Sequence, residues 1–232
     1  SDVYKRQFTT NNNNVTATQL VSNNSNTRTI NLGSSTLTFS TTATAVSLQT
    51  NTNLTFNAGT STIIVSGTSA NLTGGSASAA GVTFYNVSFT STTAGTPTIN
   101  GINTFNNLSV AAPSSAGVMQ LQVDSPQTIN GTLSTTGTAG NRRVWFHGGT
   151  YGIAQTLTIN SAPSLTDADF RDIYVIGTAA PISGTRIGNL AGCTGITFDA
   201  PKTVYWATAA GGNWSGTNWS NSAGGAVNDQ YF

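Results

Sequence analysis

The chain has 232 residues, of which only 6% are charged, and its formal net charge is +1. Thr, Ser, Asn and Gly take the place of charged residues and Glu is absent, so strand and bend formers greatly outnumber helix formers. The few basic residues are scattered, and no apolar run is long enough to span a bilayer. This composition predicts an all-β fold, with no nucleic-acid partner and no membrane insertion in this segment.

The first residues, 1–7, differ from the rest of the chain. They read Ser-Asp-Val-Tyr-Lys-Arg-Gln, which is charge-rich and resembles the translation of sequencing-adapter bases. We therefore expect residues 1–7 to be a sequencing or cloning artefact outside the fold.

Short apolar triplets with a period of two begin after this segment. Examples are Leu37-Thr38-Phe39, Leu54-Thr55-Phe56 and Leu157-Thr158-Ile159. A period of two is typical of half-buried strands, whereas a flexible linker would have no apolar side to bury. We therefore expect ordered strands along most of the chain.

A longer repeat has the pattern Phe-x-(Asn/Asp)-aliphatic-x-apolar. It begins at Phe84, recurs 21 residues later at Phe105, and returns at Phe170, close to three periods further on. The pattern predicts an inward Phe, a polar corner, and a second strand whose alternation restarts one residue out of phase. We expect the core to contain Phe84, Phe105 and Phe170. We expect equivalent corners of the coil to be occupied by Asn86, Asn107 and Asp172, with the amides of the two Asn residues stacked on each other.

This repeat predicts a right-handed parallel β-helix, or β-solenoid, over residues 8–200. Rungs of about 21 residues would give roughly nine rungs and a stack on the order of 45 Å long. Thr-Ile-Asn at 98, 128 and 158 offers a rival spacing of 30. A β-sandwich is the alternative fold, although only Asn100-Gly101 and Asn130-Gly131 have the sequence of tight hairpins.

The single histidine and the single cysteine are both expected to be structural. His147 follows Arg142-Arg143-Val144-Trp145-Phe146, and the sequence identifies neither a nucleophile nor an orienting partner for it. Cys193 has no second cysteine with which to form a disulfide or share a metal. No motif for a cofactor or a metal is present.

The carboxylate cluster of Asp167, Asp169 and Asp172 supports two interpretations. Paired carboxylates could act as acid and base on a polysaccharide, with Arg171 holding a uronate group. Alternatively, the Asp and Arg side chains neutralise each other on a solvated face. We favour the second interpretation and expect no catalytic residues here, because no second acidic cluster faces the first.

Three of the four tryptophans, Trp206, Trp214 and Trp219, lie close together near the end of the chain. Exposed indoles could stack on sugar rings, or the cluster could cap the solenoid. We favour capping, with Trp206 buried over the last rung. Residues 201–232 are thus expected to form the solenoid end or the truncated start of a following module, and both ends look cut from a longer protein.

Residues 30–225 resemble the Thr/Asn/Gly-rich right-handed parallel β-helix surface proteins of environmental bacteria and phages, such as autotransporter-like adhesins and phage tail or appendage proteins. Beside the Phe-x-(Asn/Asp)-aliphatic rungs, the resemblance is carried by Ala168-Asp169-Phe170-Arg171-Asp172-Ile173, Tyr205-Trp206, Gly212-Asn213-Trp214 and Asn218-Trp219-Ser220.

The resemblance implies a non-catalytic, elongated structural or adhesive segment, extracellular on a bacterial surface or on a virion. One alternative is a phage tail fibre that binds cell-surface glycans or a host receptor. Such a fibre could be a homo-oligomer. A second alternative is a polysaccharide lyase or glycosidase of the β-helix type.

Overall fold

The computed structural model describes residues 6–76, 80–138, 142–200, 203–208, 211–212 and 218–227. The chain divides into two compact units, Ser1–Phe198 (unit 1) and Asp199–Phe232 (unit 2). The described residues form strands and no helix, so the all-β class is confirmed. Accordingly, no described helix could cross a membrane.

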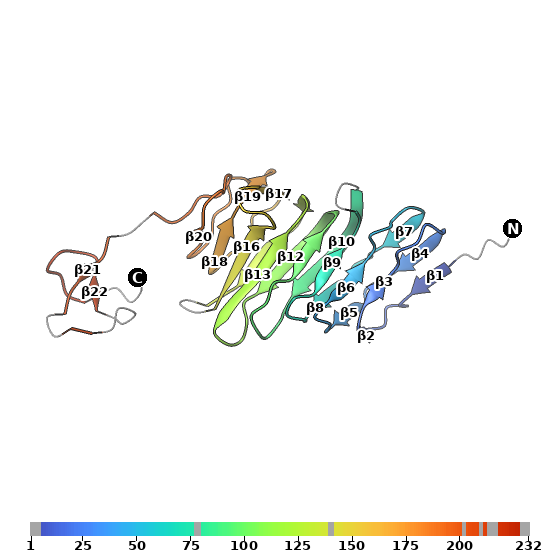
Figure 1. Cartoon of the computed structure of the whole chain (residues 1–232), viewed down its shortest axis with the longest axis horizontal. Helices are drawn as coiled ribbons and strands as arrows, with labels where there is room; N and C mark the ends of the chain where they lie inside the picture. The colour runs from blue at the N-terminus through green and yellow to red at the C-terminus, as the bar shows by residue number, and fades with distance from the viewer. Residues whose placement is uncertain are drawn as a thin grey trace. The chain divides into compact units, whose positions relative to one another are not determined.

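Unit 1 is a coil with three faces, and each turn of the coil is called a rung (Figure 1). Face 1 contains β1 (Arg6–Thr9), β4 (Arg28–Asn31), β7 (Leu54–Asn57), the first halves of β10 (Ala80–Phe89) and β12 (Ile102–Ala111), β14 (Gln127–Ile129), β17 (Gln155–Ile159) and β19 (Ile173–Ile176). Face 2 contains β2 (Val15–Ala17), β5 (Thr36–Phe39), β8 (Thr62–Val65), the second halves of β10 and β12, and β15 (Leu133–Thr136). Face 3 contains β3 (Leu20–Val21), β6 (Thr44–Ser47), β9 (Asn71–Thr73), β11 (Thr98–Asn100), β13 (Gly117–Val123), β16 (Arg142–Gly148), β18 (Ala168–Arg171) and β20 (Gly188–Asn189).

All the strand pairs described in unit 1 are parallel. Parallel neighbours on one face must be separated by a full turn of chain, which supplies the strands of the other two faces. A sandwich would instead pair antiparallel strands. The β-solenoid is therefore confirmed, and the β-sandwich alternative is wrong.

The rung length is not constant. Phe84 pairs with Phe105 after 21 residues, Thr36 with Thr62 after 26, and Thr128 with Thr158 after 30. The predicted rung of about 21 residues holds for the first pair, but other rungs are longer because bends of different length join the strands, and the expectation of roughly nine rungs is wrong. Eight strands are described on face 3. Seven steps of about 4.8 Å make the stack about 34 Å long.

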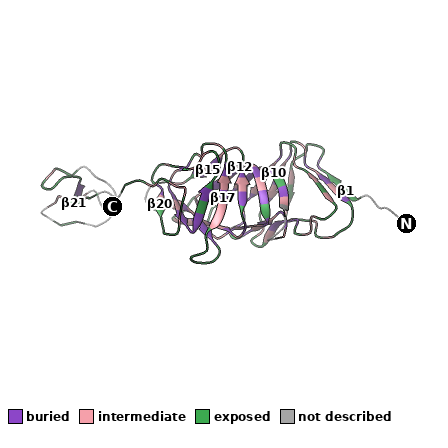
Figure 2. Cartoon of the chain, turned by 90° about the horizontal axis from the view of Figure 1, so that it is seen from above, coloured by how far each residue is buried: buried purple, intermediate pink, exposed green. Residues whose placement is uncertain are grey.

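The core lies inside the coil, where inward side chains of successive rungs pack on one another. Figure 2 shows buried residues, coloured purple, along the strands of unit 1. The phenyl rings of Phe84 and Phe105 stack with centroids 5.6 Å apart, and those of Phe146 and Phe170 stack at 5.2 Å. All three phenylalanines predicted for the core are buried. Phe170, however, belongs to face 3, and so it does not continue the column of Phe84 and Phe105.

Asn86 and Asn107 lie where β10 and β12 turn from face 1 to face 2. In β12, Asn106 and Asn107 both point outward before Leu108 points inward, as the phase shift predicts. Asn107 Nδ2 donates to Asn86 Oδ1 at 2.9 Å, so the predicted amide stacking is present. Neither Asn has a positive φ, and the backbone itself needs no special residue here.

Asp172 occupies a different corner, so its predicted equivalence to Asn86 and Asn107 is wrong. It joins β18 of face 3 to β19 of face 1 and has a φ of 52°, a left-handed conformation that Asp tolerates. The same Phe-x-polar-aliphatic pattern thus forms at two corners, because every corner needs an inward residue, a polar bend and a new phase.

The two ends of unit 1 differ. At the first rung, Arg6 and Gln7 pair with Arg28 and Thr29, so they belong to β1 although we expected residues 1–7 to lie outside the fold. Residues 1–5 are outside the described ranges. At the last rung, the ring of Phe198 lies 6.3 Å from that of Phe170 and covers part of the core.

In unit 2, β21 (Tyr205–Trp206) pairs antiparallel with β22 (Trp219–Ser220). Unit 2 starts at Asp199, and the sequence predicts a boundary after residue 200.

Candidate functional site

Face 1 presents two regular columns of neutral side chains. The first contains the in-register pair Thr29 and Thr55 and then the in-register run Thr83, Thr104, Thr128 and Thr158. The second contains Asn31, Asn57, Asn106, Asn130 and Asn160, of which two pairs are joined by amide hydrogen bonds of 2.7 and 2.9 Å. The repeated unit is therefore Thr-(Ile/Phe)-Asn, with the apolar residue in the core.

Face 2 carries a similar neutral surface. Ser109 Oγ donates to Ser88 Oγ at 2.8 Å, and Asn86 Nδ2 donates to Thr62 Oγ1 at 3.2 Å. Hydrogen bonds between neighbouring rungs satisfy these side chains. The described strands of this face contain no charged residue. Faces 1 and 2 thus provide stacking contacts and a hydrated surface.

Face 3 changes chemistry along the stack. Thr98 is followed in register by Gln122, His147 and Arg171, and Gln120 is followed by Trp145 and Asp169. The turn at residues 149–152 then brings Tyr151 over Arg171. We define the face 3 patch by its six members, which are Gln122, Asp124, Trp145, His147, Tyr151 and Arg171.

Arg171 is the centre of the face 3 patch. Its guanidinium carbon lies 3.7 Å from the ring centroid of Tyr151 and 4.9 Å from that of Trp145, so both rings contact the cation. Its NH2 group donates to the Gly148 carbonyl at 3.0 Å, and its Nε lies 3.2 Å from Asp172 Oδ2. Arg171 is thereby buried, even though it points outward from the sheet.

His147 lies beneath the same layer and is only 6% exposed. Its Nδ1 is 2.9 Å from the Gly148 carbonyl and 3.2 Å from Arg171 NH2. Burial lowers the pKa of His147 below the ordinary value, and the neighbouring Arg171 charge lowers the pKa further. His147 is therefore neutral near pH 7, which agrees with a structural role.

The lowered pKa of His147 gives a testable pH dependence. Because the unfolded chain binds the proton more readily, stability should be complete above about pH 6.5 and should fall as the pH drops below that value toward the folded pKa. The chain has one His and no Glu, so few other groups titrate in this window. Chemical denaturation at pH 7 and pH 5 should show the loss.

The His147→Gln variant is the control for this measurement, since glutamine cannot titrate. It should have nearly equal unfolding free energies at pH 7 and pH 5. A pH dependence equal to that of the unmodified chain would contradict the assignment to His147.

The predicted carboxylate cluster is an ion network that joins rungs. Arg143 donates to both oxygens of Asp169 at 2.7 and 2.8 Å, and Arg186 donates to both oxygens of Asp167 at 2.7 and 2.8 Å. Asp172 is paired with Arg171. The expected neutralisation by arginine is therefore present, but Asp167 and Asp169 use arginines from neighbouring rungs rather than Arg171.

Cys193 is half-buried, and burial raises the pKa of its thiol. The thiol is thus protonated and weakly nucleophilic at neutral pH. Among the described residues, no group of three or more metal-ligating side chains is arranged to hold a metal ion.

The tryptophan cluster does not have the predicted arrangement. Trp206 is 40% exposed, whereas Trp219 is 4% exposed, and their rings are perpendicular with centroids 5.2 Å apart. The expectation that Trp206 is largely buried is wrong, because 40% of the residue is exposed. These two indoles do not form a coplanar sugar platform, and Trp214 lies outside the described residues.

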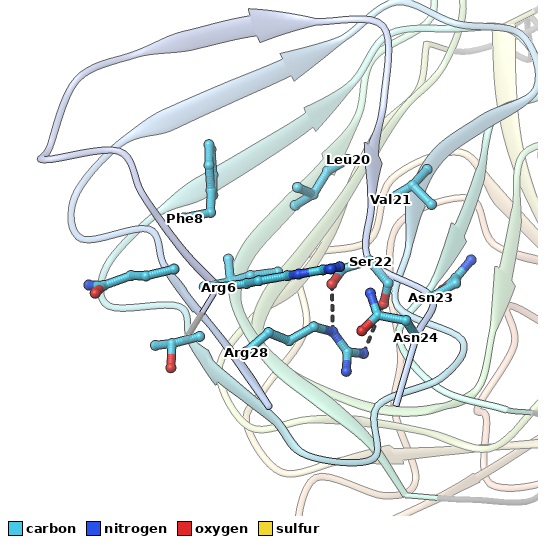
Figure 3. A pocket seen from close by; sticks show the side chains of 11 residues that line it. Arg6, Phe8, Leu20, Val21, Ser22, Asn23, Asn24 and Arg28 are labelled. Atoms are coloured by element: carbon cyan, nitrogen blue, oxygen red, sulfur yellow. Dashed lines mark hydrogen bonds between the residues drawn. The ribbon is translucent and has the colours of Figure 1, made fainter. Parts of the chain in front are cut away.

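A cavity of about 820 Å³ lies at the first rung of unit 1 (Figure 3). Phe8, Leu20 and Val21 provide its apolar lining, with Ser22 and Arg28 at its polar side. The Arg28 guanidinium is committed to structure, because it donates to Ser22 Oγ at 2.7 Å and to four backbone carbonyls of the two adjacent bends. The cavity is therefore the exposed end of the core, and its cation has no capacity left for a ligand.

Asp167, Asp169, Arg171 and His147 stand out in the sequence, whereas the grouping of Trp145, Tyr151 and their neighbours was not predicted. One signal could have revealed them: the outward residues of Trp145-Phe146-His147 replace the Thr and Asn found on other rungs. Comparisons with protein families, with curated proteins and with solved structures give no match for this chain. Its function must therefore be argued from the coil and the face 3 patch.

Proposed function

We propose that the chain is a non-catalytic structural and adhesive segment of an elongated bacterial cell-surface or phage appendage protein. The observation that carries this proposal is the parallel stack whose faces 1 and 2 expose neutral Thr, Ser and Asn columns. Because every rung is hydrogen-bonded to its neighbours, such a stack is a rigid spacer that holds its first and last rungs at a fixed distance.

The composition supports an exposed location. Neutral hydroxyl and amide side chains hydrate well without attracting charged polymers, and the chain has only eight Lys and Arg in total. Arg28, Arg143 and Arg171 are held by hydrogen bonds in buried or half-buried positions, which limits the access of trypsin-like proteases to them. A segment with these properties suits an extracellular surface or a virion.

The face 3 patch favours a second candidate function, glycan or receptor binding by an appendage such as a phage tail fibre. There the rings of Trp145 and Tyr151 both contact Arg171, so outward aromatic side chains lie beside polar and charged ones. The third candidate, a polysaccharide lyase or glycosidase, is not favoured by a described arrangement, because Asp167 and Asp169 are each held by arginine.

An incubation with polysaccharides tests the non-catalytic proposal. The full chain should release no reducing ends and no unsaturated products from dextran, galactan, mannan or polygalacturonate, and it should survive trypsin under native conditions. Turnover of one of these polymers that is lost in Asp169→Asn would contradict the proposal and favour the enzyme.

A further inference from the structure

Tyr151 presents an open aromatic ring on face 3. One side of its ring rests on the Arg171 guanidinium at 3.7 Å, yet the residue is 76% exposed. The opposite side of the ring is therefore available to another molecule. Stacking on the cation also fixes the orientation of the ring, which reduces the entropy lost when a ligand binds.

The turn that carries Tyr151 is anchored to neighbouring rungs. Gly152 N donates to Asp172 Oδ2 at 3.1 Å, and Gln155 N donates to the Asp172 carbonyl at 2.9 Å. At the other side of the turn, a Cβ on Gly149 would lie 2.1 Å from Asp124 Oδ1, so glycine permits the close approach of the turn to that carboxylate. Tyr151 is thus held on a built support.

Asp124 supplies a hydrogen-bond acceptor beside the turn. Gln122 Nε2 donates to its two oxygens at 2.9 and 3.1 Å, and Asp124 makes no ion pair with the described residues. A carboxylate has about four lone-pair sites, so Asp124 can still accept hydrogen bonds from two hydroxyl groups. Gln122 keeps the carboxylate oriented while it does so.

The layer beneath Tyr151 keeps unused hydrogen-bonding capacity. The Nε2 atom of His147, a residue that is only 6% exposed, and the Nε1 atom of Trp145 are buried and have no partner among the described residues. The two rings contact each other with centroids 4.7 Å apart. A buried polar group without a partner is unusual and points to a functional constraint on the layer that supports Tyr151.

We propose that the face 3 patch is a binding subsite for a neutral pyranose unit of a glycan. The apolar face of the sugar stacks on the open side of Tyr151, and two adjacent hydroxyls donate to Asp124. An acidic sugar is disfavoured because Arg171 and Arg143 are already paired with carboxylates, whereas Asp124 is an uncompensated negative charge. This subsite rests on the adhesive function proposed above, for which a neutral glycan would be the partner.

Affinity electrophoresis of the full chain in native gels tests the subsite. The gels contain dextran, galactan or mannan as neutral probes, or polygalacturonate as the acidic probe. We expect at least one neutral probe to retard the chain and polygalacturonate not to retard it. Retardation by polygalacturonate alone, or by none of the four probes, would overturn the proposal.

Variants of Tyr151 locate the binding. Tyr151→Ala should weaken retardation by about tenfold or more, and Tyr151→Phe should change it less than about twofold, since the ring is retained. Asp124→Asn should weaken it through loss of the charged acceptor. Tyr174→Ala is the matched control, because Tyr174 is a 46% exposed tyrosine on face 1.

The outcome for Tyr151→Ala is decisive once its thermal unfolding matches that of the unmodified chain. Unchanged retardation in Tyr151→Ala, or equal loss in Tyr174→Ala, would place binding elsewhere and overturn the subsite. Neither result affects the proposed non-catalytic role, which only turnover of a polysaccharide would contradict.

Discussion

Replacement of Phe170 by alanine should lower the free energy of unfolding by about 3–5 kcal/mol. The ring is fully buried, stacks on Phe146 at 5.2 Å, and lies 6.3 Å from Phe198 at the end of the core. Its removal leaves a cavity that cannot collapse along the stack, because parallel ladders fix the distance between rungs. Urea denaturation should show a lower midpoint with an unchanged slope.

Phe8→Ala is the matched control for this substitution. Phe8 belongs to the first rung and is 40% exposed, so its loss should cost less than about 1 kcal/mol. Equal costs for Phe8→Ala and Phe170→Ala would contradict the described core.

Asp167→Asn should destabilise the protein by about 2–4 kcal/mol. The Asp167 side chain is fully buried and accepts hydrogen bonds from Arg186 and Arg143. Asparagine keeps the shape and tolerates the left-handed φ of 53°, so the substitution isolates the loss of charge. The expected cost is below that of a fully buried pair because Arg186 is about half exposed.

Asp199→Asn controls for a change in net charge alone. Asp199 is exposed and makes no ion pair with the described residues, so this variant should unfold within about 0.5 kcal/mol of the unmodified chain. Similar unfolding free energies for Asp167→Asn and Asp199→Asn would show that the ion network adds little stability.

Much of the fold could be predicted from local pattern, because each rung follows the same inward and outward rule. The match between Phe84 and Phe105 gives a true register, since β10 and β12 both run continuously around one corner. Other rungs differ in bend length, and no single period aligns them. Thr-(Ile/Phe)-Asn occurs on face 1 at Thr29, Thr55, Thr104, Thr128 and Thr158, but the copy at Thr98 lies on face 3, so the triplet alone does not assign a face.

The wrong equivalence of Asp172 to Asn86 and Asn107 has a simple physical origin. Phe170-x-Asp172-Ile173 satisfies the same corner rule as Phe105-x-Asn107-Leu108, but it lies at a different corner of the coil. A local pattern reports whether a residue points inward, whereas the choice of corner depends on all the preceding bends. The Thr-Ile-Asn triplets show the same limit, because those at 128 and 158 are in register while the triplet at 98 lies on face 3.

The candidate site was less accessible to sequence reasoning than the fold. Arg143 and Asp169 are 26 residues apart, and their contact depends on the register of β16 and β18. Tyr151 reaches Arg171 only because a short turn folds back over face 3. Such contacts join positions whose separation in the sequence carries no signal of its own.

Formation of an engineered disulfide tests the parallel stack most directly. Ser88 and Ser109 lie in register on adjacent rungs, with their Oγ atoms 2.8 Å apart, so cysteines at both positions can bond. In a Cys193→Ala background, Ser88→Cys with Ser109→Cys should form an intramolecular disulfide under mild oxidation. Ser88→Cys with Ser134→Cys should not, because Ser134 is in register with Ser109 and thus about 9.6 Å from Ser88. A disulfide in the second pair and none in the first would contradict the stacked coil.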